Sequence, residues 1–455
     1  MTLNPIRWAR VLLLAALPLS VLAQGGLEIR HWTMPNGARV WLAESPAIPM
    51  VDVQLDFDAG SRRDPAQQSG LSAATARMMS LGLRAGDQAP ALDQNQLSEA
   101  WLDLGASMTA ESSVDRWSVY LRALTYPDLL ARAASLGARQ LAEPAFDAAV
   151  WQRERERWGA ALRESSTRPA TVASRAFAQA VYGSHPYGQT ESEATLQAIT
   201  VQSMRALHER SVLPCHARIS IVGAVDRQQA ERLVQTLLSR LPQPAAGDPR
   251  CASLPAVAEV GALAQPVERN IPFDSAQAHV LIGQPGFKRN DPDYFALIVG
   301  NYILGGGGFV SRLTSEVREK RGLSYSVYSY FTPGRHAGAF TLGLQTRPDQ
   351  AQRAVSVARE VVERFVSDGP TEEELQAAKG NLVGGFALRI DSNRKLLDNL
   401  AAIAWNDLSL DYLRTWTQQV ERVTVADIRA AFARKLQPQR VVTVVVGAAR
   451  ASAAP

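Results

Sequence analysis

One sequence pattern occurs twice in this 455-residue chain and constrains the fold more than any other feature. The two copies, residues 199–224 and 423–448, align without a gap at a constant offset of 224 residues. The matching parts are ITVQSMRA (199–206) with VTVADIRA (423–430), Pro214 with Pro438, and IVGA (221–224) with VVGA (445–448). A match that keeps its register over this length predicts a duplicated domain of roughly 220 residues, an ordinary domain size.

The order of expected elements supports the duplication. Residues 28–42 predict a hairpin that turns at Asn36-Gly37, because this dipeptide favours tight hairpin turns. A strand over residues 51–59, another over 117–124, and helices over 68–81, 93–104, 127–141 and 146–164 follow, and residues 278–446 repeat the order. Grouped strands and helices predict an α+β fold in which helices cover one face of a largely antiparallel sheet in each copy.

The composition divides the chain further. Residues 241–266 contain five prolines among alanine and glycine, which is typical of a linker. We therefore expect an N-terminal domain over residues 24–240, a linker over 241–266 and a C-terminal domain over 267–455.

The first 23 residues predict a cleavable signal peptide. Arg7 and Arg10 precede an apolar run from Val11 to Leu22, and signal-peptide cleavage is expected after Ala23. This run is shorter than the ~20 residues that span a bilayer, and we expect no membrane-spanning segment later in the chain. The mature protein is expected in the periplasm or outside the cell. Cys215 and Cys251 can form a disulfide in such a compartment, but their spacing leaves the pairing open.

Several function classes find no support in the sequence. The formal net charge is only +4, and no basic run interleaved with aromatic residues suggests nucleic-acid binding. The chain has no G-x-S-x-G motif, and the four glycines Gly305–Gly308 lack the Gly-Lys-Ser/Thr of a phosphate-binding loop.

The segment LGGGGFVSRLTSEVREKRGLSYSVYSY (304–330) contains the best candidate site. Gly305, Gly306, Gly307 and Gly308 give a backbone that can adopt positive φ and approach another chain closely. A short charged helix over 311–321 then leads into a strand. On these two elements, Arg318 and Tyr325 can both donate to the carbonyls of an extended peptide. The alternative is an exposed Arg318 paired with Glu316 or Glu319, and a tyrosine that only packs on a sheet.

This segment resembles the C-terminal half of pitrilysin-type zinc peptidases, the inverzincin group. The resemblance lies in LGGGG-x-x-SRL-x-x-x-x-REKRGLSY and extends over nearly the whole mature chain. It implies that Arg318 and Tyr325, together with Gly305–Gly308, hold the substrate backbone. It also implies a chain that forms half of a clam-shell.

The zinc motif of that family is missing. Members carry H-x-x-E-H on the first long helix of the N-terminal copy, with two zinc ligands and a general base. Here the preceding context, GSRRD (60–64) and Gly70-Leu71, is present, but the motif positions read Ala73-Ala74-Thr75-Ala76-Arg77. The alignment places the third zinc ligand at Ala161, and Glu164, one turn later, is left as an alternative.

No substitute metal site emerges from the histidines. A zinc site needs three or four converging ligands, and no two of the six histidines lie two to four residues apart. They are His31, His185, His208, His216, His279 and His336. We therefore expect no cofactor in this chain.

The resemblance implies a non-catalytic, substrate-binding subunit of a heterodimeric zinc peptidase, inactive alone, with zinc and general base supplied by a homologous partner. The alternative is a catalytically inert structural or peptide-binding protein on the same fold, like the core subunits of the respiratory cytochrome bc1 complex. A neighbouring gene for a secreted H-x-x-E-H relative would favour the peptidase. Physiological substrate and homodimer versus heterodimer stay open.

Overall fold

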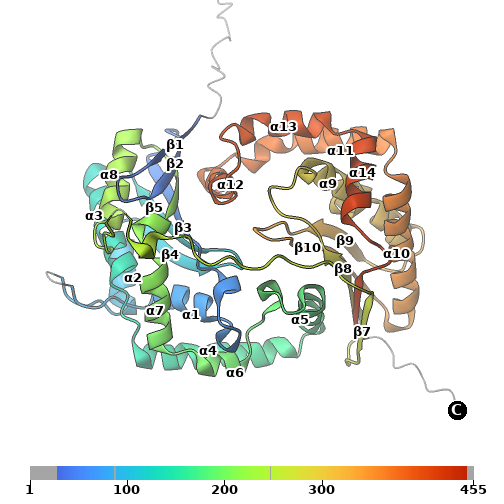
Figure 1. Ribbon diagram of the computed structural model, residues 1–455, viewed down its shortest axis with the longest axis horizontal. Helices are drawn as coiled ribbons and strands as arrows, with labels where there is room; N and C mark the ends of the chain where they lie inside the picture. The colour runs from blue at the N-terminus through green and yellow to red at the C-terminus, as the bar shows by residue number, and fades with distance from the viewer. Residues whose placement is uncertain (1–27, 87–88, 246, 448–455) are drawn as a thin grey trace, which may run out of the picture.

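The computed structural model describes residues 28–86, 89–245 and 247–447, so the signal peptide expected over residues 1–23 lies outside the described residues. The chain forms two α+β halves that lie side by side, and a connecting segment runs from one half to the other (Figure 1). None of the helices in these ranges is long and apolar enough to cross a membrane.

The first half is built on a six-stranded sheet in the order β1-β2-β6-β3-β5-β4. Every pair in it is antiparallel except β2 with β6. The strands are β1 (Ile29–Thr33), β2 (Arg39–Glu44), β3 (Met50–Phe57), β4 (Ser107–Ser112), β5 (Trp117–Leu124) and β6 (Arg218–Gly223). The helices are α1 (Leu71–Met78), α2 (Gln94–Leu102), α3 (Pro127–Ala142), α4 (Ala148–Ser166), α5 (Pro169–Tyr182), α6 (Glu193–Ala198), α7 (Val201–Ser211) and α8 (Arg227–Leu238).

The second half has a five-stranded sheet in the order β7-β11-β8-β10-β9, with β7 and β11 parallel. Its strands are β7 (Val267–Ile271), β8 (Ala278–Pro285), β9 (Ser326–Phe331), β10 (Ala339–Thr346) and β11 (Val442–Val446). Its helices are α9 (Tyr294–Asn301), α10 (Ala351–Asp368), α11 (Glu372–Gly384), α12 (Asn393–Trp405), α13 (Tyr412–Arg422) and α14 (Val425–Lys435). This order equals β2-β6-β3-β5-β4 of the first half, so the duplication is confirmed, and the first half carries β1 in addition.

Two edge strands were not predicted from the sequence. β4 (SMTAES) and β7 (VERNI) contain few strongly apolar residues. β4 alternates between exposed and less exposed positions, and the three central residues of β7 are all exposed. An edge strand has only one neighbour and more contact with solvent, so it needs no continuous apolar face. The predicted turn at Asn36-Gly37 is present, and Gly37 has a φ of +86°.

Each half supplies one helix to the sheet of the other half (Figure 1). Helix α12 packs on β6 and β3, where Leu397, Leu400 and Ala404 form a core with Trp41 and Val222. Helix α5 packs on β8 and β11 through residues that include Ala173, Phe177 and Val181. Both sheets are therefore covered on two faces, by helices of their own half and by one helix of the other half. This exchange ties the two halves together.

The segment that joins the halves is fixed to the first half at three places. Cys251 forms a disulfide with Cys215, which lies just before β6. Arg63 donates from Nη1 to the Pro255 carbonyl at 3.0 Å, and the His185 ring contacts the Ala258 carbonyl at 2.9 Å. Residues 247–266, which we call the strap, therefore have no long regular structure and pack along the junction of the two halves.

Candidate functional site

The glycine-rich segment begins inside one π-helical turn and is followed by another. Helix α9 continues into a π-helical turn over Tyr302–Gly306, and a second one covers Thr314–Glu319. The helix expected over residues 311–321 is thus present, in a wider form than an α-helix. Wide turns of this type occur often at functional sites.

The glycines differ in what they allow. A Cβ at Gly305 would lie 2.4 Å from the Ser329 hydroxyl oxygen and 2.5 Å from its backbone nitrogen, so this glycine lets the loop touch β9. Gly308 has a φ of +63°, and a Cβ added there would meet no atom within 4 Å, so this glycine serves the turn and leaves its side open. The expected positive φ is therefore found at Gly308, and the close approach at Gly305 is to β9 of the same chain.

Arg318 lies over an exposed aromatic ring. Its Cζ is 4.8 Å from the centroid of Phe309, whose side chain follows the glycine segment and is 70% exposed. The Glu316 carboxylate forms ion pairs with Lys320 Nζ at 2.7 Å and with Arg321 Nη1 at 2.6 Å. The alternative pairing of Arg318 with Glu316 is thus not what the structure shows. A cation over an aromatic face holds the guanidinium in place.

Tyr325 stands just before β9 and is 86% exposed. It lines a pocket of about 570 Å³ together with Arg318, Phe309 and three of the four glycines, Gly305, Gly306 and Gly308. The two donors expected to act together therefore share one open pocket with the glycine segment. Phe309 was not singled out in the sequence, although its place directly after four glycines is a signal for an exposed loop tip.

The edge strand β9 forms one wall of this pocket. Ser326, Tyr328 and Tyr330 are its exposed positions, and the rings of Tyr328 and Tyr330 stack with centroids 5.9 Å apart. β9 pairs only with β10, so its other edge is unpaired within the described sheet. An unpaired edge beside a pocket can take an extended peptide by main-chain hydrogen bonds.

The positions of the missing zinc motif lie on α1. Asp64 accepts hydrogen bonds from the backbone N–H groups of Gly70 and Ser72, both at 3.0 Å, and so fixes the start of this helix. One α-helical turn separates Ala73 from Arg77, which places them on the same face. The Arg77 guanidinium donates from Nε to Glu154 of α4 at 2.7 Å, and its Nη2 lies 2.6 Å from the same carboxylate oxygen.

Glu154 is a buried carboxylate surrounded by arginines. Its side chain is 2% exposed, and Arg157 and Arg153 lie 3.0 and 3.7 Å from its second oxygen. Burial opposes its ionisation, but the hydrogen bond and charge of Arg77, with the charges of Arg157 and Arg153, hold the pKa of Glu154 below its ordinary value. Glu154 is therefore an anion that protein cations neutralise.

The position expected for the third ligand lies away from this contact. Ala161, where the alignment put it, is exposed on α4. It lies seven residues after Glu154, or two helical turns of about 5.4 Å each, so it is too far along the axis to meet Arg77. The α4 carboxylate that faces α1 is Glu154. Glu164, the alternative, pairs with Arg168 at the end of α4.

The residues at this place do not fit zinc. Of the four positions, Ala73 and Ala76 offer no donor atom and Arg77 offers only a cation, which leaves Glu154 as a single carboxylate ligand. Zinc sites use three protein ligands or more. Across residues 28–86, 89–245 and 247–447, no group of three or more His, Cys, Asp or Glu side chains is arranged to hold a metal.

The chain is thus a duplicated α+β protein with an open pocket at the glycine segment and an ion pair between α1 and α4. Two family models match the chain: "Insulinase (Peptidase family M16)" over residues 39–194 and "Peptidase M16 inactive domain" over residues 198–382. A crystal structure of a peptidase M16 inactive domain from Pseudomonas fluorescens is 30% identical, covers 93% of this chain and 98% of its own, and superposes with a TM-score of 0.86.

The chain therefore belongs to peptidase family M16, the pitrilysin-type family that the sequence resembles. An uncharacterised zinc protease of Streptomyces coelicolor is 27% identical over 88% of this chain and 86% of its own length. The periplasmic protease PqqL of Escherichia coli shares the fold, with a TM-score of 0.77 and 19% identity, over 98% of this chain and 49% of its own.

Proposed function

We propose that this chain is the non-catalytic, substrate-binding subunit of a heterodimeric zinc peptidase. The observation that carries the proposal is the shared pocket of Arg318, Tyr325 and the glycine segment, in a chain whose zinc-motif positions hold no ligand set. The peptide-holding parts are kept and the bond-breaking parts are replaced. A division of labour between two homologous chains accounts for both.

The chemistry proposed for this pocket is positioning. An extended peptide beside β9 would present its carbonyl oxygens to the Arg318 guanidinium and the Tyr325 hydroxyl. Arg318 is held in place by Phe309, so little freedom is lost when it binds a substrate. Zinc and the general base would come from a partner chain that carries H-x-x-E-H, and its zinc would polarise the scissile carbonyl.

The proposed location is the periplasm or the cell exterior. The expected signal peptide supports it, as does the disulfide between Cys215 and Cys251, because such bonds persist in oxidising compartments. The solved neighbour from Escherichia coli is itself a periplasmic protease.

The test is reconstitution. The chain is co-expressed with the H-x-x-E-H relative from the same genome, and the mixture is passed through a size-exclusion column at micromolar concentration. We expect co-elution, one zinc per pair, and cleavage of a quenched fluorescent peptide mixture only by the pair. Separate elution, with the relative fully active alone, would reject the heterodimer and favour an inert binding protein.

A further inference from the structure

A second pocket lies at the junction of the two halves, apart from the glycine segment. Its volume is about 490 Å³, and residues 252–257 of the strap form part of its wall. Arg39 at the start of β2 and Arg218 at the start of β6 line it from the first half. Arg335, in the loop between β9 and β10, and Trp405 at the end of α12 line it from the second half.

The pocket has more cations than its carboxylates neutralise. Arg39, Arg218 and Arg335 all approach the single carboxylate of Asp407, with closest distances of 3.6, 2.8 and 4.0 Å. Only the Arg218 distance is short enough for a hydrogen bond. Asp407 is half-exposed and cannot neutralise three guanidinium groups at once.

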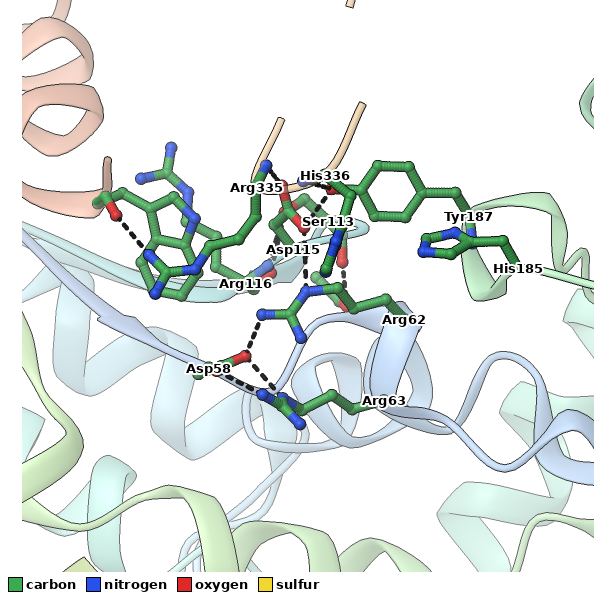
Figure 2. Close-up of polar contacts among 12 residues, drawn as sticks. Asp58, Arg62, Arg63, Ser113, Asp115, Arg116, His185, Tyr187, Arg335 and His336 are labelled. Atoms are coloured by element: carbon green, nitrogen blue, oxygen red, sulfur yellow. Dashed lines mark hydrogen bonds and ion pairs between the residues drawn. The ribbon is translucent and has the colours of Figure 1, made fainter. Parts of the chain in front are cut away.

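On the opposite wall of the pocket, the positive charges of two arginines are balanced by two aspartates. Arg62 bonds to Asp58 at 2.5 Å and to Asp115 at 3.0 Å, and Arg63 bonds to both oxygens of Asp58 at 2.7 Å. Figure 2 shows Arg62 between these two carboxylates, with Arg335 on the far side of Asp115. Glu259, the other carboxylate of the lining, pairs with Lys288 at 2.7 Å. The unbalanced positive charge therefore belongs to Arg39 and Arg335.

Trp405 adds a neutral donor without a partner. The residue is 5% exposed, and its indole Nε1 has no hydrogen-bond partner among the described residues. The guanidinium groups of Arg218 and Arg335 both lie over its ring, 5.6 Å from the centroid. A buried N–H that lacks an acceptor costs free energy, and Trp405 is one of the residues that line the basic pocket.

The guanidinium groups of Arg39, Arg218 and Arg335 also repel one another. Burial, and the neighbouring charges of Arg218 and Arg335 against the attraction of Asp407, lower the pKa of Arg39 from its ordinary value. An anion in the pocket would relieve this repulsion. It would also contact Arg39 of the first half and Arg335 of the second half together.

We propose that this junction pocket binds a small anion through carboxylate or phosphate oxygens, held by the guanidinium groups of Arg39 and Arg335 and the indole N–H of Trp405. Guanidinium groups bind both kinds of oxygen by paired hydrogen bonds. The volume exceeds that of a single phosphate, which favours an extended organic anion such as a dicarboxylate. Binding here is independent of peptide positioning at Arg318 and stabilises the contact between the halves.

The experiment uses the purified mature chain in low-salt buffer and isothermal titration with two probes, glutarate and inorganic phosphate. We expect one site per chain for at least one probe, and the tighter probe identifies the source of the oxygens. Arg39→Gln with Arg335→Gln should weaken binding at least tenfold. The matched control, Arg168→Gln with Arg364→Gln, removes two exposed arginines that each pair with a glutamate four residues earlier in the chain, and it should change binding less than twofold.

A second variant keeps the test decisive where the double variant is unstable. Trp405→Phe keeps an aromatic ring in place of the indole and removes the N–H. We expect this variant to weaken binding severalfold with an unchanged circular dichroism spectrum. Saturating probe should raise the melting temperature of the wild type and not that of the Arg39/Arg335 double variant. No binding of either probe at millimolar concentration, or equal binding by the wild type and both pocket variants, would overturn the proposal.

Discussion

Arg77 and Glu154 form an ion pair between α1 and α4, with the guanidinium Nε 2.7 Å from the carboxylate oxygen. A protein cation thus lies beside the carboxylate that α4 presents to the altered motif positions on α1. Arginine side chains neutralise the negative charge of Glu154, and the motif positions on α1 supply no zinc ligand. The altered motif is therefore an integrated part of the fold, with its own effect on stability.

Removal of Arg77 should destabilise the chain in a pH-dependent way. Arg77→Ala leaves Glu154 buried with weaker partners, and we expect a loss of about 1–3 kcal/mol in the free energy of unfolding at pH 7. Because the native pKa of Glu154 lies below 4.5, this stability is present above pH 4.5 and is lost as the pH falls through the native value. Urea denaturation at pH 7 and pH 4 measures it.

Arg163→Ala is the matched control, because Arg163 lies on the same helix and pairs with an exposed glutamate, Glu193. We expect it to cost less than about 1 kcal/mol at either pH. Equal losses for the two variants at pH 7 would show that the Arg77 contact carries no special weight.

Restoration of the motif should create a zinc site. The purified wild-type chain is expected to bind no stoichiometric zinc and to cleave no peptide. Ala73→His, Ala76→Glu and Arg77→His together would add two ligands and a base to Glu154. We expect one zinc per chain by metal analysis after dialysis. Addition of Glu154→Gln should abolish it, and zinc retention in that fourfold variant would contradict the assignment of Glu154.

The disulfide should contribute to stability through the strap. It closes a loop between residues 36 apart, which corresponds to about 3–4 kcal/mol in the loop-entropy estimate. Cys215→Ser with Cys251→Ser should lower the free energy of unfolding by roughly 2–4 kcal/mol. Reduced wild type should match the double variant. Identical denaturation midpoints under oxidising conditions would show that the strap is held by its other contacts.

Two glycines of the candidate site should respond differently. Gly305→Ala places a methyl group against Ser329 and should cost about 1–3 kcal/mol. Gly308→Asn should cost well under 1 kcal/mol, because asparagine tolerates the left-handed conformation and the space beside Gly308 is open. Equal destabilisation by the two substitutions in urea titrations would contradict the close contact between the loop and β9.

Local pattern was enough to predict the duplicated α+β halves, the hairpin at Asn36-Gly37 and the altered motif on α1. The exchange of α5 and α12 was not predictable, because amphipathic spacing shows that a helix is covered but not by which sheet. The same exchange explains why Asp52, Gln54 and Asp56 of β3 are buried although they alternate with apolar residues. They lie on the sheet face that α12 covers.

The candidate site was predicted in part for similar reasons. The Arg318 and Tyr325 positions followed from a continuous motif, and the structure brings both to one pocket. Glu154 was missed because it lies 77 residues after Arg77 along the chain, and no local pattern marks a contact over that separation. The junction pocket draws residues from six separate segments, and no local pattern marks such a site.

The central claim is that Arg318 and Tyr325 hold peptide substrates for a zinc-bearing partner. It is tested by the peptidase activity of the reconstituted pair, with wild type, Arg318→Ala, Arg318→Lys and Tyr325→Phe compared on the same peptide mixture. We predict normal complex formation and a loss of about 10²–10³ in rate for Arg318→Ala, with poor rescue by lysine, which lacks the planar fork. Full activity of the Arg318→Ala complex would contradict the claim.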